Sequence, residues 1–194
     1  AQLGIEEGLP DLGFAPGDPN TVYAAAYQRR RHVAGFLSGG PGSGIHKSMD
    51  GGKTWRKVTT GLPGGDKGKI GLAVTPADPT IVYATIEASN AERGFYRSRD
   101  RGESWEKRNS YISGGTGPHY YQEIEASPTD ADVVYQADVF INVTRDGGAS
   151  FNVLETGHTK HSDNHAIWID AKNTRHLLVG TDAGGMGCGT HQAV

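Results

Sequence analysis

The sequence contains a single cysteine, Cys188, in 194 residues. One cysteine excludes an internal disulfide and a cysteine-rich zinc cluster. The chain also lacks an apolar run of the roughly 20 residues that a membrane-spanning helix needs, so we expect no membrane insertion. Positive charge is not in excess, because 19 Lys and Arg stand against 22 Asp and Glu. We therefore expect no nucleic-acid partner.

Glycine, by contrast, is abundant. The chain has 29 glycines and 9 prolines, and they recur at intervals along its length. Such punctuation favours many short strands joined by tight turns. No segment shows helical periodicity beyond about two turns. The composition therefore predicts an all-β protein.

A repeated motif is the strongest signal. It has the pattern Ser/Thr-x-Asp-x-Gly-x-Ser/Thr-aromatic and occurs three times, with starts 50 and 46 residues apart. A second motif, a Pro/Asp turn followed by Val-Tyr, keeps a fixed phase with it, and a degenerate fourth copy begins at Ala171. The defining residues of the repeated motif are Ser48, Asp50, Gly52 and Trp55, then Ser98, Asp100, Gly102 and Trp105, then Thr144, Asp146, Gly148 and Phe151.

Each repeat reads as four short strands, and a period of 46–50 residues with four strands is typical of a β-propeller blade. We therefore predict one all-β domain over residues 1–194, a propeller of antiparallel blades with about three and a half blades present. The blades are expected at about 10–60, 69–109, 120–156 and, incomplete, 164–194. The tail from Gly184 does not continue the pattern. Another chain or further blades are expected to close the ring.

The repeated motif is expected to be structural. Its hydroxyl and carboxylate can accept hydrogen bonds from the N–H groups of the hairpin itself. Its glycine permits a backbone conformation that a Cβ would penalise, and its aromatic residue supplies buried area. A calcium loop gathers several oxygens, whereas each copy offers one carboxylate.

This motif resembles the Asp box, or BNR repeat, of sialidases, xyloglucanases, sortilin-type receptor propellers and photosystem II assembly factors. The stretches Tyr27–Arg31 and Asp163–Asp170 are similar to uncharacterised bacterial exported proteins described as glycosyl hydrolases or as sortilin-like. The resemblance implies a propeller located outside the cell or in the periplasm. These families have unrelated functions, so the resemblance implies no single activity. The arginine-bearing motif that opens sialidases is absent, which argues against sialidase activity.

Topology predicts where a ligand would bind. The Pro/Asp turns and the repeated motifs fall at one end of every blade, and the links between blades fall at the other. Binding residues sit on loops held by a rigid scaffold, so the second end is the candidate. The ligand-binding candidates there are Arg29, Arg30 and Arg31 in the loop 28–44, His119, Tyr120 and Tyr121 before blade 3, and His165 before blade 4.

Each of these candidates also has a simpler interpretation. The arginines could bind a carboxylate or a sulfated sugar, with at most two converging, or they form a solvated run. Phe36 and the two tyrosines could stack on sugars or pack the loops. His158, His161 and His165 could bind a metal with Asp163, but their spacing matches no established ligand motif. We expect solvated histidines there, with no metal and no cofactor.

Three functions remain open at this point. The first is an exported scaffold that binds protein or glycan through the links. The second is a glycoside hydrolase of the xyloglucanase type, or a part of one, which needs two carboxylates. Its catalytic candidates are Asp163 and Glu123, with Asp66, Glu87 and Glu92 nearby, and the sequence pairs none of them. The third is a metal-dependent enzyme that uses the link His158–His165.

Overall fold

The computed structural model describes residues 7–113, 121–154, 161–182 and 187–190. These residues form strands and turns without a helix. Accordingly, the described part of the chain contains no helix that could span a membrane. The all-β prediction is confirmed.

The strands form four antiparallel sheets, which we call blades 1 to 4. Blade 1 contains β1 (Glu7–Phe14), β2 (Val22–His32), β3 (Gly35–Ser38), β4 (Gly44–Ser48) and β5 (Arg56–Val58). Blade 2 contains β6 (Ile70–Val74), β7 (Val82–Ile86), β8 (Gly94–Ser98) and β9 (Glu106–Asn109). Blade 3 contains β10 (Ile124–Ala126), β11 (Val134–Gln136), β12 (Asn142–Thr144) and β13 (Asn152–Val153). Blade 4 contains β14 (Asn164–Ile169), β15 (His176–Thr181) and β16 (Gly187–Thr190).

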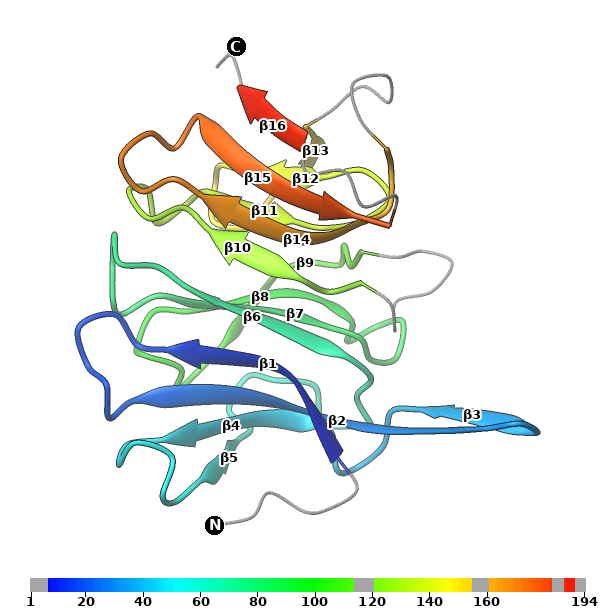
Figure 1. Cartoon of the computed structure of the whole chain (residues 1–194). Coiled ribbons are helices and arrows are strands. Elements are labelled where there is room, and N and C mark those ends of the chain that lie inside the picture. Colours follow the sequence, from blue (N-terminus) through cyan, green and yellow to red (C-terminus); the bar gives the residue numbers. More distant parts are fainter. Residues whose placement is uncertain (1–6, 114–120, 155–160, 183–186, 191–194) are drawn as a thin grey trace.

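The blades stack in chain order, so that their first strands β1, β6, β10 and β14 follow one another along one side of the molecule (Figure 1). The repeated motifs and the Pro/Asp turns lie together at one end, which we call the turn end. The links between blades lie at the opposite end, the link end. This arrangement is a partial β-propeller, as the sequence predicts.

Two segments differ from expectation. The segment 28–44, predicted as a loop, contains the end of β2 and all of β3, which pair from Arg29↔Ser38 to His32↔Gly35. This two-stranded arm projects from blade 1 at the link end (Figure 1). The tail does continue the blade pattern, because β16 pairs with β15 through Leu178↔Cys188 and its neighbours. In both cases backbone pairing with an adjacent strand overrides a glycine-rich local sequence.

Hydrophobic side chains fill the three junctions between blades. Tyr23 and Ile45 of blade 1 pack with Leu72 and Trp105 of blade 2. A second cluster joins blades 2 and 3, and a third joins blades 3 and 4. A four-stranded sheet buries its faces only against its neighbours, so these junctions constitute the core.

The repeated motifs form turns that their own hydrogen bonds hold. In the first copy the Ser48 hydroxyl accepts from Gly52 N at 2.8 Å, and the Asp50 carboxylate accepts from both Thr54 N and Thr54 Oγ1. The second and third copies repeat these bonds. Gly52 has a φ of 86°, a conformation that favours glycine. The Thr54 hydrogen bonds lower the pKa of Asp50 to about 2.

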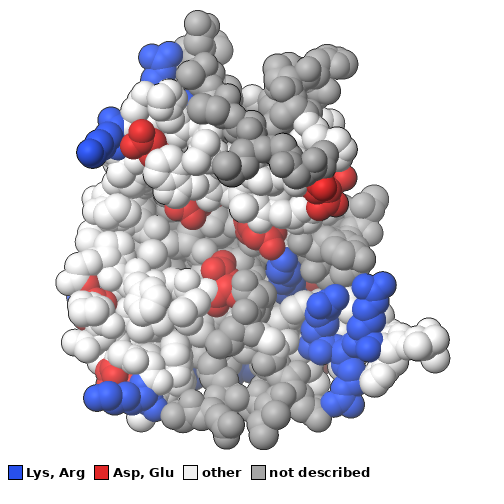
Figure 2. Space-filling model, in the orientation of Figure 1, with Lys and Arg blue, Asp and Glu red and all other residues white. Residues whose placement is uncertain are grey.

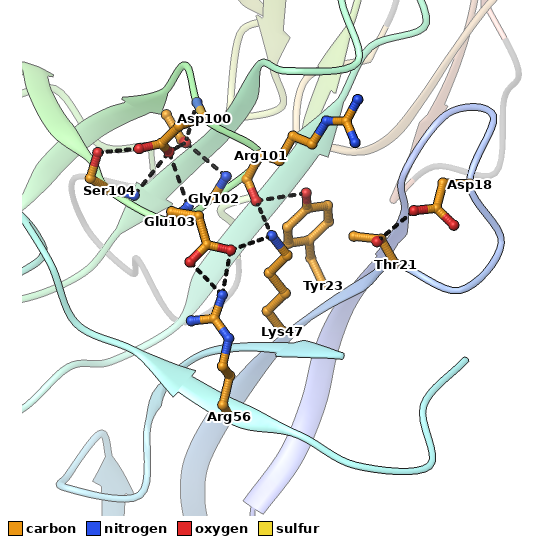
Figure 3. A network of polar contacts seen from close by, with 11 residues as sticks. Asp18, Thr21, Tyr23, Lys47, Arg56, Asp100, Arg101, Gly102, Glu103 and Ser104 are labelled. Carbon is orange, nitrogen blue, oxygen red and sulfur yellow. Dashed lines mark hydrogen bonds and ion pairs between the residues drawn. The ribbon is translucent and has the colours of Figure 1, made fainter. Parts of the chain in front are cut away.

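Buried cations fasten two of the junctions at the turn end. Lys47 Nζ lies 2.7 Å from both Glu103 Oε1 and the Arg101 carbonyl oxygen of blade 2, and Tyr23 donates to the same carbonyl (Figure 3). Arg101 has a φ of 59° and stands where the other two copies have glycine.

The next junction uses the same positions with different partners. Arg97 pairs with Asp132 of blade 3 at 2.8 Å, and Tyr83 donates to the Ala131 carbonyl at 2.7 Å. Tyr23 faces Lys47 across its strands and Tyr83 faces Arg97, so each tyrosine shares a face with a cation. Both cations are buried: Lys47 is 3% exposed and Arg97 is 7% exposed.

Candidate functional site

A groove of about 230 Å³ runs between the first strands of the blades. Acidic side chains gather around the middle of this side of the molecule (Figure 2). Because first strands line the axis of a propeller, the groove is the part of the central channel that these blades enclose. Its lining includes Asp11, Lys69, Glu123, Glu125 and His165.

Asp11 joins β1 to β6 across the groove. Its Oδ2 accepts from Leu72 N at 2.7 Å, and its Oδ1 accepts from Leu12 N at 2.8 Å. The first bond satisfies an edge amide of β6 that has no strand partner on that side. Burial raises the pKa of Asp11, and the two amide bonds offset only part of that effect.

Two glutamates flank Ile124 and differ in charge partner: Glu123 comes immediately before β10, and Glu125 lies within it. Lys69 Nζ lies 2.6 Å from Glu123 Oε1, whereas Glu123 Oε2 is buried and accepts no hydrogen bond from the described residues. Glu125 opens into the groove, but the groove walls withdraw enough water to raise its pKa to about 7, with a further contribution from the charge of Asp11. The groove therefore contains one carboxylate paired with a lysine and one carboxyl with a raised pKa.

His165 lines the groove and is supported by stacking on Tyr121. The rings of Tyr121 and His165 are nearly parallel, at 6°, with centroids 5.3 Å apart. Tyr121 donates to Asp163 Oδ1 at 2.9 Å, and His165 Nε2 lies 3.2 Å from Asp182 Oδ1. Tyr121 is buried, whereas a third of the His165 side chain is exposed, so the imidazole is the ring presented to a ligand.

Two residues adopt strained backbone conformations, one shortly before β10 and one immediately before β14. Gln122 has a φ of 94° and Asp163 a φ of 63°. Gln122 is fully buried and is held by Ser113 and by Thr85, whose hydroxyl donates to its side-chain oxygen at 2.8 Å. The Gln122 carbonyl lies so close to Gly71 that a Cβ there would fall 1.6 Å from it. The groove floor is therefore set by close backbone contact between blades 2 and 3.

The structure brings some of the sequence-predicted residues together and separates others. Glu123, Tyr121, Asp163 and His165 lie in or beside the groove. Arg29, Arg30 and Arg31 lie on the arm at the link end, are exposed, and do not line the groove. His119, Tyr120 and His158 lie outside the described residues.

The remaining carboxylates and histidines have other surroundings. Asp66 and Glu87 line a second hollow of about 250 Å³ at the base of the arm, and Glu92 accepts from Gly64 N. His161 is exposed, with Nδ1 2.7 Å from the Ser162 carbonyl oxygen. The described residues contain no group of three or more His, Cys, Asp or Glu placed to hold a metal ion.

Sequence reasoning missed Asp11, Lys69, Glu125 and Asp182. Two of them carried a detectable signal. Asp11 and Glu125 each place a carboxylate within a first strand, and Glu125 stands between the buried Ile124 and Ala126. First strands lie next to the central channel of a propeller, so a carboxylate within a first strand indicates a channel residue.

Comparisons with known proteins agree with this fold. The chain is 34% identical over 116 residues to the xyloglucanase Xgh74A of Acetivibrio thermocellus. The aligned region covers 56% of this chain and 13% of that protein. It is 25% identical to a xyloglucanase of Paenibacillus sp over 92% of this chain and 19% of that protein. The crystal structure of the GH74 xyloglucanase from Xanthomonas campestris matches with a TM-score of 0.67 and 18% identity, covering 94% of this chain and 29% of that one.

No family model matches the chain. The chain spans less than a third of the length of each of these three proteins. The structural match shows the fold, a partial β-propeller that resembles part of a larger one. Further blades are needed to close the ring.

Proposed function

We propose that this chain is a glycan-binding part of an Asp-box propeller and that it holds the glycan in the groove at the link end. One observation carries the proposal. The Tyr121–His165 stack stands at the wall of a groove lined by carboxylates, a lysine and an amide. Stacked rings offer a flat surface to a sugar, and groups of both hydrogen-bonding types fix its hydroxyls. The names of the relatives, all xyloglucanases, support a glycan as the ligand.

The anchoring of the groove supports this proposal. Asp182 holds His165 through Nε2, and Asp163 holds the Tyr121 hydroxyl. Side chains fixed in this way lose little freedom when a ligand binds, which favours affinity. The proposal carries with it a location outside the cell or in the periplasm, which fractionation of the producing cells checks.

The test is calorimetric titration with xyloglucan oligosaccharides. We expect His165→Ala to weaken binding about tenfold, because it removes both the stacking surface and a hydrogen-bonding group. Glu106→Gln is the matched control, since Glu106 is exposed on β9 and pairs with Arg108 away from the groove. Equal binding by His165→Ala and the wild type would place the glycan elsewhere. Absence of binding to any neutral oligosaccharide would reject the proposal.

A specific observation favours a second function, glycoside hydrolysis. Hydrolysis needs one carboxyl that donates a proton and one that stays ionised. Glu125, with its pKa raised to about 7, fits the acid, and Glu123, which pairs with Lys69 in the same groove, is the candidate for the second carboxylate. Release of reducing ends from xyloglucan measures this activity. Glu125→Gln is expected to abolish release while keeping oligosaccharide binding, whereas a wild-type protein that binds without release is a binding module.

A further inference from the structure

We propose that one face of the arm is a subsite for a sugar unit that carries a carboxylate. The glycan that this propeller binds is therefore expected to contain a uronate-type sugar unit, and that unit lies on the arm rather than in the groove. The inference rests on the proposed glycan-binding function and names the class of glycan.

Charge sets the arm apart from the rest of the chain. The whole chain has a net charge of −3, yet no Asp or Glu occurs between Asp18 and Asp50. Lys and Arg side chains gather where the arm leaves blade 1 (Figure 2). An anion that approaches the link end therefore meets a cationic projection beside an acidic groove.

Strand register places two of the three arginines on one face. Directly paired residues of an antiparallel ladder share a face, so Arg29 lies with Ser38 and Arg31 lies with Phe36. Arg30 pairs with Leu37 and belongs to the opposite face. Residues two apart in a strand are separated by about 6.6 Å. The face therefore carries two arginines and one aromatic ring, with Phe36 directly across from Arg31.

The contacts of this face suit an acidic sugar. The Arg29 guanidinium lies over the Phe36 ring, 5.6 Å from its centroid. Phe36 is 40% exposed, so the ring is accessible for stacking against the apolar face of a sugar. Guanidinium groups bind carboxylates through paired hydrogen bonds, and more firmly than an ammonium group does.

The small size of the arm favours a sugar over a folded protein. The arm consists of residues 29–32 and Gly35–Ser38 joined by a short turn. A stable protein interface uses roughly 20–30 residues on each side. A subsite for one or two sugar units needs only the two arginines and the ring.

The two sites also impose a direction on the ligand. The carboxylates Asp11 and Glu123 in the groove disfavour a second carboxylate, whereas the arm favours one. The uncharged units of the glycan then occupy the groove, and the acidic unit lies on the arm.

The experiment compares an oligogalacturonate with its methyl ester, which keeps the sugar backbone and removes the charge. Wild-type protein is expected to bind the acid at least about tenfold more tightly, and the double variant Arg29→Gln, Arg31→Gln should lose that preference. Arg30→Gln, with one charge removed from the opposite face, is the control and should keep it. The arm contributes little to the core, so all variants should show the thermal unfolding midpoint of the wild type.

Two results overturn the inference. The first is equal binding of the acid and the ester by the wild type. The second is binding of poly-glutamate as tightly as oligogalacturonate with the same dependence on Arg29 and Arg31, which would make the partner an acidic polypeptide. Binding of neutral xyloglucan oligosaccharides that depends on His165 separates this failure from failure of the proposed function.

Discussion

The junctions on the two sides of blade 3 are built differently. Blades 2 and 3 are joined at the turn end by Arg97 with Asp132 and by the Tyr83 hydroxyl. Blade 3 repeats the tyrosine as Tyr135, but Val143 stands across from it where the earlier blades have a cation. The position from which Lys47 and Arg97 reach the next blade is therefore apolar in blade 3.

Blade 4 is fastened at the link end instead. The Asn164 side chain donates to the carbonyl oxygens of Asp138 and Val139, at 2.7 and 3.1 Å, and Asp163 accepts from Tyr121. These bonds lie beside the groove. Polar contacts beside His165 therefore also hold blade 4, so the site and this junction share residues.

The largest difference is expected from core truncation on the two sides of blade 3. Phe95 is fully buried and meets the Phe151 ring edge-on at 5.0 Å. Phe95→Ala should lower the free energy of unfolding by about 3–5 kcal/mol. Val143→Ala at the other junction removes two methyl groups and should cost about 2 kcal/mol. Urea titration followed by tryptophan fluorescence measures both.

Equal losses for Phe95→Ala and Val143→Ala would mean that the two junctions contribute alike despite their different construction. A loss confined to blade 4 in the Val143 variant, seen as faster amide exchange in β14 and β15 alone, would sharpen the contrast between the junctions.

A smaller effect is expected from the buried cations. Arg97→Ala removes a charged hydrogen bond to Asp132 and should cost about 2 kcal/mol. Arg93 is exposed at the link end of the same blade, so Arg93→Ala is the matched control, with a change within about 0.5 kcal/mol. The difference should fall only in part at high salt, because the Arg97 end of the pair is buried and is screened less than a fully exposed pair. Equal effects of the two substitutions would show that Arg97 does not fasten blade 3.

A further effect concerns pH. Glu125 faces β14 across the groove, and its pKa rises from 4.5 to about 7 on folding. The native state therefore binds more protons between those values, and the free energy of unfolding should fall as pH rises from about 4.5 to 7. Glu125→Gln should flatten this slope. If the slope is the same in the Glu125→Gln variant, another titrating group is responsible for it.

The turn end provides the opposite sign. Hydrogen bonds from Ser150 lower the pKa of Asp146 from 3.8 to about 2, so its contribution is present above pH 4 and is lost as pH falls toward 2. Asp146→Asn should reduce the loss of unfolding free energy between about pH 4 and 2. It should leave the slope of the unfolding free energy between about pH 4.5 and 7 unchanged.

Local chemistry explains which features the sequence predicts. Ser48, Asp50 and Thr54 bond to one another within seven residues, so their motif identifies the turn, and its repetition identifies the propeller. The groove depends on distant segments, because Asp11 and Leu72 meet only after blades 1 and 2 have packed. The position of Asp11 within a first strand is visible in the sequence, but its hydrogen bond to Leu72 is not.

The arm is an intermediate case. Alternation along extended chain allows at most two of the three arginines to converge, and the register confirms that two share a face. The pairing of β2 with β3 was not apparent, because Gly35, Gly39 and Gly40 around this segment suggest a flexible loop. Glycine permitted the turn, but backbone hydrogen bonding between the strands decided the structure.

The Tyr83–Arg97 pair has a consequence for how such a chain can change over time. The first two junctions each join one face of a blade to a turn of the blade that follows, and in the described part of the chain these contacts stop at that neighbour. Duplication or loss of a whole repeat would therefore disturb only the junctions on either side of the change. Gene rearrangement could lengthen or shorten the ring while the walls of the groove keep their sequence.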